Sequence, residues 1–218
     1  MKISEIYEKY KIMPQLQEHM LRVTAVASLI AGKFGKKLDK RTIITATLLH
    51  DLGNMAKIKL GTFPEFVQLL GVDYWEKVLA QFKQKYGNDD YTATYTILKE
   101  LKVSKEIYNL IQSLEFAKSP QTAEGNSTEL KICLYSDARV SPHGVVTLNE
   151  RLKEVKDRYM RNKGVSEEKF NQISQSLYSI EKQIFAHCKI KPEDITEEKV
   201  RPMFDELRNF EIETGSIR

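Results

Sequence analysis

The chain of 218 residues is 41% hydrophobic and 29% charged, and this much apolar surface excludes extended disorder. Its 34 basic and 30 acidic residues leave a net charge of +4, which is too small to indicate a nucleic-acid polymer as partner. With only 10 glycines and 6 prolines, the composition favours helices over a β-sandwich or barrel, which needs turn residues at every corner.

Apolar residues recur every three or four positions from Leu16 to Phe34, which is the spacing of one helical face. Pro14 suits the first turn of this helix, because the missing N–H has no partner there. A second helix is predicted from Asp39, a good N-cap, to the neighbourhood of Gly53, and residues 57–61 are predicted to form a loop.

Helical spacing continues through the rest of the chain, with caps at polar residues. Helices are predicted after Pro64, over 74–86, from Asp89 or Asp90 to about 101, from Ser104 to about 114, and over 128–140. Residues 119–127 are predicted to be an exposed loop, and the helix over 128–140 is expected to break at Pro142 and Gly144. Three last helices are predicted at 147–162, 166–187 and 193–210, with caps at Thr147, Ser166 and Asp194.

We therefore predict a single all-α domain without a strand hairpin. No apolar run approaches the roughly 20 residues that cross a bilayer. No signal-peptide apolar core follows Met1 either, so we expect a soluble, cytoplasmic protein without a membrane partner.

Two of the four histidines, His19 and His50, lie on apolar helix faces. His50 is followed by Asp51, and a carboxylate at the last turn of a helix faces the negative end of the macrodipole, which costs about 0.3–1 kcal/mol. Asp51 therefore needs a cation, which can be a divalent metal shared with His50 or a lysine. Asp137 lies in another apolar helix, either as a metal ligand or as a buried carboxylate paired with Arg139 or Arg151.

Three segments in this order resemble the HD-domain metal-dependent phosphohydrolase superfamily. They are His19-Met20-Leu21-Arg22-Val23, Thr47-Leu48-Leu49-His50-Asp51-Leu52-Gly53 and Tyr135-Ser136-Asp137-Ala138-Arg139-Val140. The resemblance implies an HD-type helical bundle over residues 1–145, with residues 146–218 as a C-terminal helical extension packed on it. It also implies one divalent ion (Mn, Co, Mg, Fe, Ni or Zn) held by His19, His50, Asp51 and Asp137.

In that superfamily a metal-activated water attacks a phosphate ester, so the resemblance implies a hydrolase whose partner is a small phosphorylated substrate, a nucleotide. Many members continue the doublet as HDxGK, whereas Asn54 follows Gly53 here. Lys57 or Lys59 can replace that cation, or can be ordinary solvated lysines. We expect Asn54, Lys57 and Lys59 to bind substrate.

Arg22 follows His19 by one helical turn and is expected to contact a substrate phosphate; an ion pair with Glu18 or another acid is the alternative. The expected catalytic residues are then Asp51, Arg22 and Lys57. Tyr91 and Glu115 stand where further ligands of dinuclear members can fall.

No histidine lies between Asp51 and Asp137, which favours a single ion. His143 and His187 are expected to lie outside the site. The alternative function is a non-catalytic HD-fold module that binds a nucleotide or a protein partner in a regulatory role. A homodimer is left open.

Overall fold

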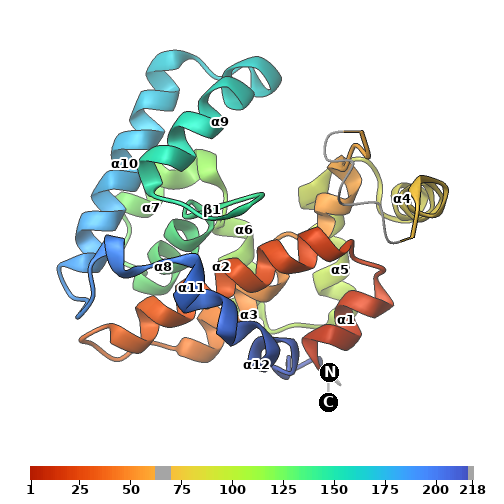
Figure 1. Ribbon diagram of the computed structural model, residues 1–218, viewed down its shortest axis with the longest axis horizontal. Helices are drawn as coiled ribbons and strands as arrows, with labels where there is room; N and C mark the ends of the chain where they lie inside the picture. Colours follow the sequence, from red (N-terminus) through yellow and green to blue (C-terminus); the bar gives the residue numbers. More distant parts are fainter. Residues whose placement is uncertain (62–69, 216–218) are drawn as a thin grey trace.

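The computed structural model describes residues 1–61 and 70–215, and helices make up most of this part of the chain, which confirms the all-α prediction (Figure 1). The helix predicted after Pro64 lies outside the described residues. In chain order the first elements are α1 (Ile3–Lys9), α2 (Pro14–Lys33), α3 (Lys40–Leu49), η1 (Leu52–Lys57), α4 (Val72–Tyr86), α5 (Asp90–Leu101), α6 (Lys105–Ser113), η3 (Phe116–Lys118) and α7 (Ser119–Glu124).

The second half of the chain contains α8 (Thr128–Asp137), β1 (Val140–Ser141), β2 (Gly144–Val145), α9 (Leu148–Lys163), α10 (Glu167–Phe185), η4 (Pro192–Asp194), α11 (Glu197–Val200), η5 (Arg201–Met203) and α12 (Phe204–Arg208). In the described part of the chain, every helix falls short of the length or the apolar character that crossing a membrane requires.

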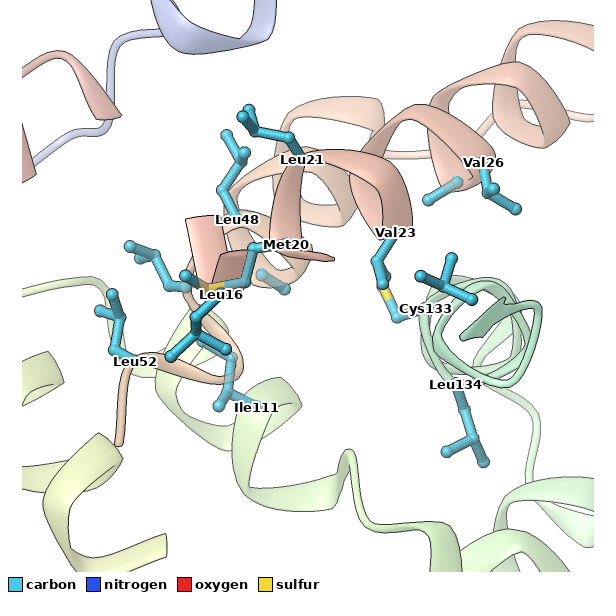
Figure 2. Packing of buried hydrophobic residues seen from close by; sticks show 14 of the residues in the cluster. Leu16, Met20, Leu21, Val23, Val26, Leu48, Leu52, Ile111, Cys133 and Leu134 are labelled. Atoms are coloured by element: carbon cyan, nitrogen blue, oxygen red, sulfur yellow. The ribbon is translucent and has the colours of Figure 1, made fainter. Parts of the chain in front are cut away.

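The core forms around α2, which packs against α3 and α8. Pro14 begins α2 as predicted, and the Asp39 carboxylate caps α3 by accepting a hydrogen bond of 3.0 Å from the Thr42 amide. Close to the start of α2, buried side chains from α2, α3, η1 and α6 meet, and farther along Val23 points toward Cys133 of α8 (Figure 2). This packing fixes the positions of α2, α3 and α8, which carry or adjoin the candidate ligands.

Residues 119–127 were predicted to form a loop, but Ser119–Glu124 form α7. Pro120 is compatible with a helix because it falls in the first turn. Ser119 and Thr122 are buried, and α7 packs against α10. Tertiary packing therefore stabilises a helix that the polar composition of this segment does not favour.

Three further differences from the prediction have local causes. The chain turns at Pro142 into a hairpin in which Val140 pairs with Val145, although no hairpin was predicted. The helix predicted over 193–210 is divided into α11, η5 and α12, because Pro202 has no amide hydrogen to continue it. Asp194 does not cap a long helix; its carboxylate accepts a hydrogen bond from the Lys191 amide at 2.9 Å. The short helix α1 was not predicted.

Arg139 connects the end of α8 to the C-terminal third of the chain. Its side chain is 2% exposed and donates hydrogen bonds to the Tyr135 hydroxyl (2.6 Å) and the Val146 carbonyl (2.5 Å). It also donates to the carbonyls of Pro192 and Ile195, at 3.2 and 3.3 Å. Helices α9 and α10 form an antiparallel pair beside this connection (Figure 1), and α11 and α12 contact α2.

Candidate metal centre

Four side chains from three helix ends and the middle of α2 converge on one point. His19 lies on α2, His50 follows the last residue of α3, Asp51 precedes η1, and Asp137 ends α8. The His19 Nε2 atom lies 3.4 Å from Asp51 Oδ2 and 3.2 Å from Asp137 Oδ1. The corresponding distances from His50 Nε2 are 3.6 and 3.7 Å, and the two imidazole centroids are 5.6 Å apart.

The surroundings of His50 leave one ring nitrogen directed at the carboxylates. Its Nδ1 lies 2.8 Å from the Thr47 carbonyl, which can only accept, so Nδ1 carries a proton. Its Nε2 is buried and has no hydrogen-bond partner in the part of the chain that the structure describes. A histidine held by a backbone carbonyl, with its other nitrogen free, is the usual arrangement of a metal ligand.

The ligand atoms of His19, His50 and Asp51 all lie within 4.8 Å of one another, which is the spacing of groups that can bind one ion. Asp137 joins them through its contacts with both imidazoles. Two imidazoles and two carboxylates suit a borderline divalent transition metal better than calcium, which prefers oxygen ligands alone. The residues present therefore fit a divalent metal.

Electrostatic interactions within the ligand set raise the pKa values of the two histidines and lower those of the two aspartates. Burial alone would lower the pKa of His50, but the charge of Asp51 and the nearby Asp137 carboxylate outweigh it and raise the pKa to about 9. Burial would likewise raise the pKa of Asp137, yet its contacts with His19 and His50 hold it well below the usual value. In the metal-free protein the positive charge of the His50 imidazolium thus balances part of the charge of the carboxylates.

This charge state predicts how metal affinity depends on pH. A metal must displace the His50 proton at any pH below about 9, so affinity should fall as pH decreases. For one displaced proton the expected decrease is about tenfold per pH unit. Competition with a chromophoric chelator at pH 6, 7 and 8 measures it, and equal affinities at pH 6 and 8 would contradict the assignment.

A cavity of 670 Å³ opens beside the four ligands, and three of the residues expected to bind substrate line it. These are Asn54, Lys57 and Lys59. The Lys57 ammonium forms an ion pair with Asp90, which is 7% exposed, and lies 5.3 Å from the centre of the Tyr91 ring. A fixed cation therefore stands in the same cavity as the ligand set.

Arg22 does not line this cavity, contrary to the expectation that it contacts a substrate phosphate. Its Nε lies 2.8 Å from Glu197 Oε2, and Nη2 lies 3.6 Å from Glu18. The guanidinium also covers the Phe204 ring at 5.6 Å, and the residue is only 6% exposed. The ion-pair alternative is the one that the geometry supports, so Arg22 attaches α11 and α12 to α2.

Replacing Arg22 with methionine should therefore lower stability without changing the KM for a phosphorylated substrate. Glu197 would lose its partner, but its side chain is 39% exposed and can be hydrated. We expect a decrease in the free energy of unfolding of about 1–2 kcal/mol, measured by urea denaturation. A KM that rises tenfold at unchanged stability would instead restore Arg22 to the substrate site.

Helix α9 contributes cavity residues that the sequence analysis missed. Arg151, Val155 and Tyr159 lie one turn apart and all line the cavity. Arg151 was considered only as an ion-pair partner, although the four-residue spacing was visible and marks one helix face. Asp90, expected as a helix cap and as a weaker candidate acid or base, is the buried partner of Lys57.

Of the other residues considered as possible metal ligands, one lines the cavity and the others have different surroundings. Tyr91 lines the cavity, whereas Glu115 pairs with Lys118 at 2.5 Å. His143 is exposed in the turn between β1 and β2. His187 packs against the Phe34 ring, with centroids 6.0 Å apart, away from the ligand set.

A helical bundle that brings two histidines and two aspartates to one point belongs to the class of helical metal-binding proteins. The family model described as HD domain matches residues 16–139, which is more than half of the chain, so the protein belongs to the HD domain family. This family lies within the metal-dependent phosphohydrolase superfamily, and its members bind divalent metals. No curated protein and no solved structure matches the chain.

Proposed function

We propose that this protein hydrolyses the phosphate ester of a small substrate, a nucleotide, with one divalent ion (Mn, Co, Mg, Fe, Ni or Zn) held by His19, His50, Asp51 and Asp137. The observation that carries the proposal is the buried Nε2 of His50, which lies between two aspartates beside a cavity that contains the Lys57 cation and which has no hydrogen-bond partner among the described residues. A bound divalent ion supplies a water of lowered pKa and neutralises charge on the phosphoryl oxygens.

The chain's own residues then bind and orient the substrate. Lys57 is held by Asp90, yet its side chain is 46% exposed, so its ammonium can also donate to a phosphate oxygen. Lys59 and the Asn54 amide line the same cavity. Arg151, whose side chain is 13% exposed and paired with Glu154, takes the role of the guanidinium that was expected from Arg22. Asp51 orients the attacking water as well as contributing a ligand atom.

A single ion follows from the donors available around the cavity. A dinuclear site needs further ligands, and Glu115 is already paired with Lys118. His143 is exposed in the turn between β1 and β2, and His187 packs against the Phe34 ring. We therefore propose one ion per chain, with water or substrate phosphate completing its coordination.

The proposal is tested by measuring phosphate release from a panel of nucleotides with Mn²⁺, Co²⁺ or Mg²⁺. The wild type should be active, EDTA should abolish activity, and Asp51→Ala should be inactive. His187→Ala is a matched control that should retain activity, because His187 contacts Phe34 instead of the ligand set. Phosphate release that neither EDTA nor Asp51→Ala affects would refute the proposal.

Two observations favour a second function, in which the protein is a non-catalytic module that binds a nucleotide or a protein partner. Asn54 stands where many family members have lysine, and the Lys57 charge is partly neutralised by Asp90. Prolonged incubation of the protein with nucleotide and metal distinguishes the two functions. Nucleotide that stays bound and intact supports the module, whereas release of phosphate supports the enzyme.

A further inference from the structure

The lining of the cavity has two chemically different parts. The four ligands, Asn54 and Lys57 belong to its polar part, whereas its apolar part includes four aromatic rings. The cavity volume of 670 Å³ is within the range of pockets that enclose whole small organic molecules, and a phosphate group alone would fill only a small part of it. The apolar part of the lining is therefore available to the organic part of a phosphate ester.

The aromatic rings come from two sides of the cavity. Tyr91 and Tyr95 lie one turn apart on α5, with ring centroids 6.4 Å apart. Phe116 of η3 and Tyr159 of α9 pack at 4.9 Å, with their planes at 50°. Tyr159 is 8% exposed and also contacts the Phe170 ring of α10, with ring centroids 6.2 Å apart. The Tyr159 ring is therefore packed against two aromatic neighbours.

Tyr91 connects the polar and the aromatic parts of the lining. Lys57 Nζ lies 5.3 Å from its ring centre, and the Tyr95 ring lies 6.4 Å from it. Burial raises the pKa of the Tyr91 phenol, so this phenol stays neutral beside the Lys57 ammonium. Because the ligands, Lys57 and these rings all line one cavity, the two parts of the lining belong to one site.

The wall formed by α9 is not part of the region that the family shares. The family match ends at residue 139, and α9 begins at Leu148. Arg151, Val155 and Tyr159 nevertheless line the cavity from one face of this helix. Chemistry at the ligand set and recognition at α9 are therefore provided by separate parts of the chain.

We propose that the aromatic part of the cavity lining is a subsite for a planar aromatic group, a nucleobase. We further propose that Tyr159 determines the preference for phosphate esters that carry a nucleobase. The proposal rests on the phosphohydrolase function above and specifies its substrate class. Aromatic side chains stack on every base because each base has a π-face. A saturated alkyl group would gain burial in this part of the cavity but no stacking.

The experiment compares kcat/KM for the four nucleoside 5′-monophosphates with that for ribose 5-phosphate, the same ester without a base. The wild type should prefer at least one nucleotide by roughly tenfold or more, which corresponds to the stacking of one base. Tyr159→Leu removes the ring but keeps an apolar side chain, and it should bring this ratio close to one. Tyr159→Phe should retain the preference. Tyr178→Leu, which replaces a 43% exposed aromatic residue on α10, is the control for ring removal elsewhere.

Equal kcat/KM values for nucleotides and ribose 5-phosphate would overturn the proposal, as would an unchanged ratio in Tyr159→Leu. A kcat/KM for hexyl phosphate equal to that for the nucleotides would show that this part of the cavity binds any apolar group and does not select aromatic ones, which would also overturn the proposal. Equilibrium dialysis of adenosine and uridine against the metal-free protein gives a readout that needs no catalysis. If no ester is hydrolysed, the phosphohydrolase function fails. Nucleoside binding that Tyr159→Leu weakens then still supports the subsite, and its absence overturns it.

Discussion

Alanine in place of His19, His50 or Asp137 should remove the metal from the purified protein. Each substitution takes away one of four donors that lie within 3.7 Å of their neighbours, and it leaves the remaining charges without their partner. We expect metal affinity to fall by at least about 100-fold, because even residues that only support ligands alter it by 10- to 100-fold. Elemental analysis after dialysis measures the metal content, which should be one equivalent in the wild type.

His143→Ala and His187→Ala are the controls, since they remove the same side chain from places outside the ligand set. Both should keep one equivalent of metal. Metal loss in either control, or two equivalents in the wild type after dialysis, would show that the ligand assignment is wrong. Circular dichroism should accompany the measurements, so that metal loss through unfolding is recognised.

Among substitutions near the site that add only a methyl group, Gly53→Ala should be the most destabilising. A Cβ atom at this position would lie 2.0 Å from the Asp90 carbonyl oxygen and 2.5 Å from the Thr94 amide nitrogen, and both are backbone atoms that cannot rotate away. The Gly53 amide also donates to Thr94 Oγ1 at 3.0 Å, so η1 is held tightly against α5. We expect a loss of about 3 kcal/mol in the free energy of unfolding, at the upper end for overpacking.

Urea denaturation of the variant checks the expected loss. Gly32→Ala is the matched control, because a Cβ there meets nothing within 4 Å and alanine favours the helix α2. Any structural relief in Gly53→Ala must move η1 away from α5, and Asp51 and Asn54 flank that contact. Metal affinity should therefore fall together with stability, and a variant as stable as the wild type would contradict the close approach.

The features that could be predicted from the sequence are those with local causes. Asp39, Ser104, Thr147 and Ser166 each accept a hydrogen bond from the amide three residues ahead, and a cap of this kind is visible in a few consecutive residues. The helix Ser119–Glu124 could not be predicted in this way, because its stability comes from packing against α10. The same holds for α1, whose Ile3 amide donates to Phe210 near the other end of the chain.

In the candidate site, too, the residues with local sequence signals could be predicted, whereas those whose position depends on distant packing could not. His19, the His50-Asp51 doublet and Asp137 were singled out by residue type and order, and the structure brings all four together. The spacing of Arg22 from His19 places both on one side of α2, but spacing does not reveal that Glu197, 175 positions later, pairs with the guanidinium. The cavity wall formed by α9 was missed for a related reason, since its position depends on how the last third of the chain folds back.

The buried Arg139 network has a consequence for how the protein unfolds. Arg139 is the last residue of the family match, and its hydrogen bonds go to carbonyls at Val146, Pro192 and Ile195. Of these hydrogen bonds, melting of the C-terminal third would leave the guanidinium only the one to the Tyr135 hydroxyl, and that hydroxyl would lose the Glu181 carboxylate. The family core and the segments after it should therefore melt in one calorimetric transition. A peptide cut after residue 139 would retain all four donors in its sequence, yet it would lose the interactions that hold the last of them in place.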